Sequence, residues 1–226
     1  MMIIAVLIFS SLVTSPHTDI SPAPLMGMNE YQTSLSSDFP VRDKMKQTTI
    51  AEKDWFHPKY GKWGPLAVTF PAPKIPDCVD CVEWKRDRII EVAKHHIGLP
   101  YERDDGQRGH FPARGCGLDC SNFAAWVYNY GLGIRFTSNV HDLWASKTAG
   151  RTLSPDEKLE RGDLVFLEWG TMHVVIYIDE NQIIDSTNIY KNKNGIHIRD
   201  IRKPQHHWYQ PDSDNPYYLG TRRFIE

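Results

Sequence analysis

The order of helical and strand-like patterns along this chain limits its possible folds more strongly than any other feature. Two helical patterns come first, "VEWKRDRIIEVAKHHIG" at 82–98 and "DCSNFAAWVYNYG" at 119–131. Four strand-like patterns follow after residue 160: "GDLVFLEWG", "HVVIYIDENQIIDST", "GIHIRDI" and "YYLGTRRFI". Helices followed by consecutive strands predict helices packed on an antiparallel sheet, so we expect an α+β fold.

Stop and capping signals mark the ends of both helices. Gly98 and Pro100 follow the first helix, and both residues are typical of the end of a helix. Asp119 is the expected N-cap of the second helix, and Gly131 is its expected end. A long polar loop joins the two helices, and we expect an irregular stretch between the second helix and the first strand.

Composition divides the chain into three parts. Residues 1–15 are apolar and too short for a membrane helix of about 20 residues. They resemble the core of a secretory signal and predict export, although no lysine or arginine precedes Arg42. Residues 16–77, the N-terminal arm, hold nine of the fifteen prolines, and their first half shows neither helical nor strand periodicity. The second half, residues 54–76, is rich in aromatic residues, which predicts that this part of the arm lies extended against the domain. Residues 78–226 are expected to form the folded domain.

The overall composition is that of an ordinary globular protein. Of the 226 residues, 41% are hydrophobic and 24% are charged, and the formal net charge is -2. No basic run is present, so the sequence gives no sign of nucleic-acid binding. We expect a monomer without a cofactor and without a stable membrane span.

Cys120 lies at a position that favours a reactive thiol. It falls in the first turn of the second helix, and a helix N-terminus stabilises the nucleophilic thiolate form of cysteine. His173 begins the strand "HVVIYI", which is apolar on both faces and therefore belongs in a sheet covered on both sides. Packing the helix on this sheet brings the two residues together as a Cys–His dyad. Free cysteines are more often buried and inert, so the position alone does not establish a nucleophile.

Zinc binding is the alternative chemistry that the cysteines allow. The motifs "CVDC" and "CGLDC" supply four thiols: Cys78, Cys81, Cys116 and Cys120. A helix over residues 82–97 would place Cys81 about 24 Å from the start of the next loop, so we expect no metal site. For "CVDC" itself, a local disulfide and two free thiols both stay open. The histidine pairs at 95–96 and 206–207 point apart on regular elements, and we expect them at the surface.

Five sequence blocks, in their order along the chain, resemble the NlpC family of papain-like cell-wall cysteine peptidases. The blocks are "IGLPY", "LDCSNFAAWVYNYGLGI", "RGDLVFL", "HVVIYIDENQIIDS" and "YLGTRRFI", within residues 82–226. The resemblance implies a papain-like fold with the nucleophile at a helix N-terminus. It also implies a secreted or envelope enzyme that cleaves peptidoglycan stem peptides, usually at the γ-D-glutamyl–diamino acid bond.

The resemblance assigns roles to individual residues of this chain. Cys120 matches the nucleophile and His173 matches the general base. Asp119 and Ser121 match the neighbours that hold the free amino end of the stem peptide, and Tyr101 matches a tyrosine that reaches toward the nucleophile.

The third catalytic position departs from the family pattern. The residue twelve positions after the base is usually histidine, whereas Asp185 occupies it here. A carboxylate accepts the imidazole N–H, so a Cys–His–Asp triad is chemically sound. A hairpin loop of three or five residues would place Asp185 on the face of His173, whereas two or four residues would favour Ser186. We predict Asp185.

Two further departures concern the substrate. Asn122 replaces a small residue, which narrows the expected groove. The loop from Tyr101 to Cys120 is long and contains Arg103, Arg108 and Arg114, which either bind substrate carboxylates or are ordinary surface charges. Related papain-like proteins act on lipids as acyltransferases or amidases, but the polar loop before Cys120 disfavours an apolar acyl groove.

Overall fold

The computed structural model describes residues 26–55, 57–60, 65–77, 79–102, 117–189, 194–203, 209–211 and 214–226. Its α-helices are α1 (Met28–Ser34), α2 (Phe39–Arg42), α3 (Cys81–His95), α4 (Cys120–Leu132) and α5 (Val140–Ala145). Two short 3₁₀ turns, Glu52–Asp54 and Pro58–Tyr60, lie between α2 and α3. No helix in these described ranges is long and apolar enough to cross a membrane.

The described strands form one antiparallel sheet in which the order of the strands differs from their order in the sequence. They are β1 (Arg151–Thr152), β2 (Leu164–Glu168), β3 (Met172–Asp179), β4 (Gln182–Thr187), β5 (Gly195–Asp200) and β6 (Tyr218–Arg223). Their order in the sheet is β1-β6-β2-β3-β4-β5, and every neighbouring pair is antiparallel. The expected α+β fold is therefore confirmed.

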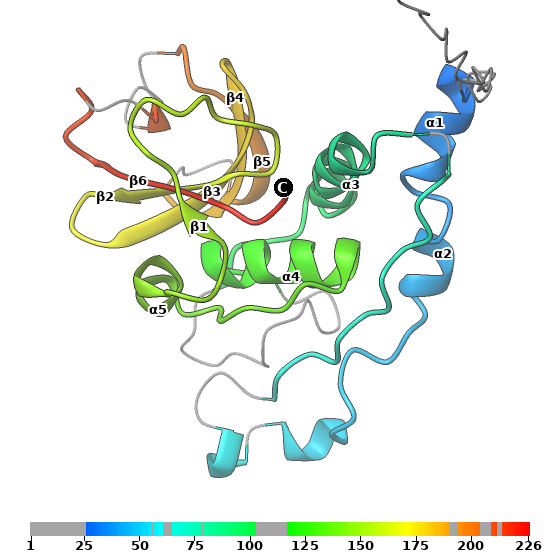
Figure 1. Ribbon diagram of the computed structural model, residues 1–226. Coiled ribbons are helices and arrows are strands. Elements are labelled where there is room, and N and C mark those ends of the chain that lie inside the picture. Colours follow the sequence, from blue (N-terminus) through cyan, green and yellow to red (C-terminus); the bar gives the residue numbers. More distant parts are fainter. Residues whose placement is uncertain are drawn as a thin grey trace, which may run out of the picture.

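Helix α4 lies at the centre of the molecule, between α3 and the sheet, and all thirteen of its residues are buried (Figure 1). Its N-cap is Asp119, as the sequence indicates, but it ends at Gly133, two residues after the expected Gly131. Gly133 adopts a left-handed backbone (φ 70°), which closes the helix. Gly131 instead lets α3 approach, because a Cβ there would lie 3.3 Å from the side chains of Ile89 and Val92.

The two faces of the sheet carry separate apolar clusters. Alternate residues of β3, such as Val174 and Ile176, contact the large core around α4. The intervening residues Val175 and Tyr177 belong to a smaller cluster on the other face, together with Tyr209. This burial on both sides agrees with the continuous apolar pattern of "HVVIYI".

The β3–β4 hairpin decides which residue shares a face with His173. Its loop has two residues, because Asp179 pairs with Gln182, and a regular ladder from that pair would place Ser186 on the face of His173. A bulge between Tyr177 and Asp179 shifts the register by one residue, so that Ile176 pairs with Ile184. This shift turns Asp185 to the face of His173.

The first half of the arm is helical although its sequence shows no helical periodicity, whereas residues 66–76 contain neither helix nor strand. Residues 28–42 form two short helices, and the arm runs along the side of α3 and α4 away from the sheet (Figure 1). Asp38 binds two buried arginines, since Arg42 Nε and Arg88 Nη2 each donate to it at 2.6 Å. Buried charges need such partners, and these contacts tie the arm to α3.

Three local expectations were wrong. Helix α3 ends at His95, three residues before the expected stop at Gly98. His96 is buried, with Nδ1 donating to the carbonyl of Val92 and Nε2 accepting from Trp126 Nε1, both at 2.8 Å. The expected irregular stretch after α4 contains α5 and β1. His96 escaped prediction because only the packing of α4 against α3 supplies its indole partner.

Candidate active site

Cys120 is the first residue of α4, and its side chain faces the strand that carries His173. The Asp119 carboxylate caps the helix by accepting from the backbone N–H of Asn122 at 2.8 Å. Cys120 is buried, with 8% of its surface exposed. Helix α4 packs on β3 and β4, and this contact brings the helix start to the start of β3.

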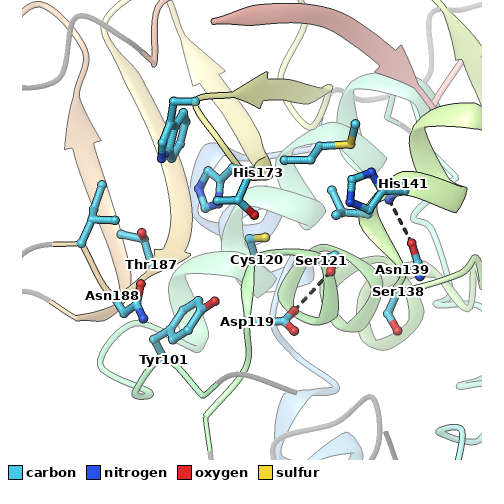
Figure 2. Close-up of a pocket in the computed structure, with 15 residues that line it drawn as sticks. Tyr101, Asp119, Cys120, Ser121, Ser138, Asn139, His141, His173, Thr187 and Asn188 are labelled. Atoms are coloured by element: carbon cyan, nitrogen blue, oxygen red, sulfur yellow. Dashed lines mark hydrogen bonds between the residues drawn. The ribbon is translucent and has the colours of Figure 1, made fainter. Parts of the chain in front are cut away.

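His173 lies beside Cys120 and is hydrogen-bonded to Asp185. Its Nε2 donates to Asp185 Oδ2 at 2.9 Å, and the imidazole lines the same pocket as the Cys120 thiol. Figure 2 shows the imidazole beside the thiol. His173 and Asp185 are both buried, so bulk water screens the interaction between them only weakly.

The charged groups around His173 favour the protonated form of its imidazole. Burial by itself lowers the pKa of His173, but the electrostatic interactions with Cys120 and Asp185 and the hydrogen bond to Asp185 have the larger effect and raise the pKa to about 10. Burial raises the pKa of Asp185, but its bonds to His173 and Arg199 outweigh burial and lower it. The site therefore favours a protonated imidazole at His173 beside the ionised carboxylate of Asp185.

Three residues that the sequence analysis missed surround Asp185 and His173. Arg199 Nε donates to Asp185 Oδ1 at 2.5 Å, and the Tyr209 hydroxyl donates to Oδ2 at 3.0 Å. Trp169 packs against the imidazole, with ring centroids 5.2 Å apart. Strand alternation in "GIHIRDI" was the available signal for Arg199, whereas no local pattern pointed to Tyr209 or Trp169.

A pocket of about 340 Å³ opens in front of Cys120 and His173. Tyr101, Asp119 and Ser121 all line it, so the structure gathers every residue that the resemblance implied for the substrate (Figure 2). Ser121 is buried, and its hydroxyl donates to Asp119 Oδ1 at 3.2 Å. The pocket thus places a carboxylate beside the nucleophile.

The opposite side of the pocket comes from a segment that the sequence analysis left without a role. Ser138, Asn139 and His141 lie across Cys120 from Tyr101 (Figure 2). Asn139 caps α5 by accepting from the backbone of His141 and Asp142. The short helix was not recognised because it has only six residues, too few to show a period.

Several candidate residues lie outside the described residues. They are Arg103, Arg108 and Arg114 of the loop, and the thiols Cys78 and Cys116. Within the part of the chain that is described, Cys81 is an exposed free thiol, and no group of three or more metal-binding side chains occurs.

Comparison with solved structures found several similar proteins. A NlpC/P60 family protein from Bacillus cereus is 24% identical, with a TM-score of 0.47, and the match covers 69% of this chain and 42% of that one. NlpC1 from Trichomonas vaginalis is 20% identical, with a TM-score of 0.44 and coverage of 62% and 44%. RipD from Mycobacterium tuberculosis, described as a non-catalytic NlpC/p60 domain protein adapted to peptidoglycan binding, is 17% identical, with a TM-score of 0.43 and coverage of 62% and 98%.

The chain spans less than half the length of the first two of these proteins. No match was found among curated proteins. The profile of the NlpC/P60 family matches residues 98–212, which is just over half of the 226 residues. The matched range contains α4 and strands β2 to β5. The chain therefore belongs to the NlpC/P60 family.

Proposed function

We propose that this protein is a cysteine peptidase that hydrolyses the γ-D-glutamyl–diamino acid bond of peptidoglycan stem peptides. NlpC/P60 domains act on peptidoglycan, and family membership suggests a cell-wall peptidase. One observation carries the proposal: Cys120, at a helix N-terminus, lines a pocket together with His173, and His173 is hydrogen-bonded to Asp185. This arrangement supplies a nucleophile, a base and a group that orients the base. With this substrate, the protein works in the cell envelope.

Acylation begins when the Cys120 sulfur attacks the carbonyl carbon of the scissile amide. The proton that the thiol has lost resides on His173, as the raised pKa of this imidazole favours. The backbone N–H groups of Cys120 and Ser121 would donate to the forming oxyanion, because the first residues of a helix have no intrahelical acceptor and the cap of α4 uses the N–H of Asn122. As the C–N bond breaks, His173 gives its proton to the leaving amine, and a thioester to Cys120 remains.

Deacylation reverses the roles of the same residues. A water molecule loses a proton to the now neutral His173 and attacks the thioester carbon. The carbon–sulfur bond breaks, the peptide leaves with a new carboxyl group, and the proton on His173 again balances the thiolate of Cys120. The products are one amine and one carboxylic acid per water consumed.

The replacement Asp185→Asn tests the orienting carboxylate. We expect kcat/KM to fall by roughly 10²- to 10⁴-fold, since the amide retains the size of the side chain but removes the charge that holds the imidazole. Because acylation needs the imidazolium, wild-type activity should decline as pH rises through about 10, the pKa of His173. Loss of the Asp185 charge lowers this pKa, so the alkaline limb of the pH profile should move to lower pH.

Circular dichroism and thermal unfolding of Asp185→Asn control for folding, because Asp185 also binds the buried Arg199. A folded Asp185→Asn variant with wild-type kcat/KM and an unshifted alkaline limb would remove Asp185 from the catalytic unit. The remaining Cys120–His173 pair would then be the proposed machinery.

The Asp119 carboxylate is proposed to bind the free α-amine of the stem peptide. It is 6% exposed and is the N-cap of the pocket-facing helix, directly before Cys120, where a negative charge opposes formation of a thiolate unless a cation binds beside it. N-acetylation removes that cation. We expect the acetylated peptide to be cleaved at least about tenfold more slowly, a loss of about 1.4 kcal/mol.

The variant Asp119→Asn separates amine binding from helix capping. Asparagine caps a helix about as well as aspartate, so α4 keeps its N-cap while the charge is lost. The variant should cleave the free peptide about as slowly as wild type cleaves the acetylated one, with no further loss on acetylation. Equal wild-type rates on the two peptides would leave Asp119 with the capping role alone.

The proposed reaction itself is tested with the full chain and a synthetic L-Ala–γ-D-Glu–diamino acid peptide. Mass spectrometry should detect L-Ala–D-Glu together with the freed diamino acid end. Absence of these products from stem peptides and from muropeptides would overturn the proposed function.

A further inference from the structure

A second pocket adjoins the catalytic one. It has a volume of about 550 Å³ and shares Ser138 and Asn139 with the pocket in front of Cys120. These two residues lie on the side of Cys120 opposite Tyr101 (Figure 2). If the free amine binds beside Asp119 and Tyr101, the peptide beyond the scissile bond runs toward this second pocket.

The lining of the second pocket combines one cation, one anion and an apolar wall. The charges are Arg135 and Asp142, and the apolar side chains are Leu66 and Phe136. Leu66 comes from the arm and is 61% exposed, although an apolar residue of this size is usually covered. A ligand that fits this lining has a hydrocarbon part and carries both charges.

Arg135 and Asp142 do not form an ion pair with each other. Arg135 donates to the Thr69 hydroxyl at 3.3 Å, and no carboxylate of the described residues forms an ion pair with it. Among the same residues, no cation lies within ion-pair distance of the Asp142 side chain. Each group therefore has its charge available to a ligand, and an arginine fork pairs well with a carboxylate.

We propose that this second pocket binds the free amino-acid end of the diamino acid on the leaving side of the scissile bond. That end carries an ammonium and a carboxylate on one carbon, at the end of a hydrocarbon chain. Arg135 takes the carboxylate, Asp142 takes the ammonium, and Leu66 and Phe136 cover the chain. The inference rests on the proposed function, and it assigns substrate selection to residues that include one from the arm.

Two peptides distinguish this arrangement from a general electrostatic effect. A diaminopimelate peptide carries both charges at its free end, whereas the matching lysine peptide carries the ammonium without the carboxylate. Binding is measured by calorimetry on the full chain with Cys120→Ala, so that the peptide stays intact. Arg135→Gln should weaken the diaminopimelate peptide about tenfold and leave the lysine peptide within about twofold.

Asp142→Asn probes the other charge. It should weaken both peptides by about fivefold to tenfold, since both carry the ammonium. It should have no effect on a lysine peptide whose side-chain amine is acetylated. Lys147→Gln and Asp156→Asn serve as matched controls, because they remove exposed charges of the same signs outside both pockets.

The inference fails if Arg135→Gln changes the affinity of the two peptides by the same factor, or changes neither. Hydrolysis by the chain that retains Cys120 is measured in parallel. If the chain hydrolyses the peptide but binding does not depend on Arg135, the binding role of the second pocket is wrong while the proposed function stands. Binding that depends on Arg135, without any hydrolysis, would support the second pocket as a binding site and overturn the proposed function.

Discussion

Replacement of Cys120 by alanine is expected to abolish hydrolysis, with kcat falling by roughly 10⁴-fold or more. In the proposed reaction the sulfur of Cys120 forms the thioester, and no other described side chain of the pocket is a thiol. Alanine suits a helix start that is already capped by Asp119, so the fold should persist. Product formation is measured by mass spectrometry, with thermal unfolding as the check on folding.

Cys81→Ala is the matched control for this replacement. Cys81 is an exposed free thiol at the start of α3, away from the pocket, and its loss should leave the rate unchanged. The same Cys120→Ala chain should also titrate His173 at lower pH, because the thiolate that raises the pKa of this imidazole is gone. NMR of the imidazole protons measures that shift. A Cys120→Ala chain with wild-type activity would contradict the peptidase assignment.

Replacement of His173 by alanine should be almost as damaging as loss of Cys120. Residues that act as one catalytic unit are not additive, and without the imidazole neither the sulfur nor the leaving amine has a proton partner. We expect kcat to fall by roughly 10³-fold or more. Adding Cys120→Ala to this variant should then lower the rate little further.

His95→Ala is the control for loss of an imidazole elsewhere. His95 lies on α3 and pairs with Asp43 of the arm at 3.2 Å, outside the catalytic pocket. Its loss should leave kcat near the wild-type value. A folded His173→Ala variant that retains more than about a tenth of the wild-type rate would show that another group handles the proton.

Local patterns in the sequence determined helices α3 and α4, most strands and the candidate nucleophile. Apolar spacing marked α3 and α4, and the "LDCS" stretch placed a cysteine in the first turn of a capped helix. The continuous apolar run of "HVVIYI" indicated a strand buried on both faces. These features depend on neighbours a few residues away, which is why a single sequence reveals them.

Tertiary structure alone decided the rest of the site. A two-residue loop by itself would have turned Ser186 toward His173, and the bulge before Asp179 turns Asp185 there instead. Arg199 and Tyr209 reach the same carboxylate from fourteen and twenty-four residues further along the chain. Leu66 reaches the second pocket from the arm. A bulge and contacts across such distances arise from packing of whole elements, and no local period in the sequence encodes them.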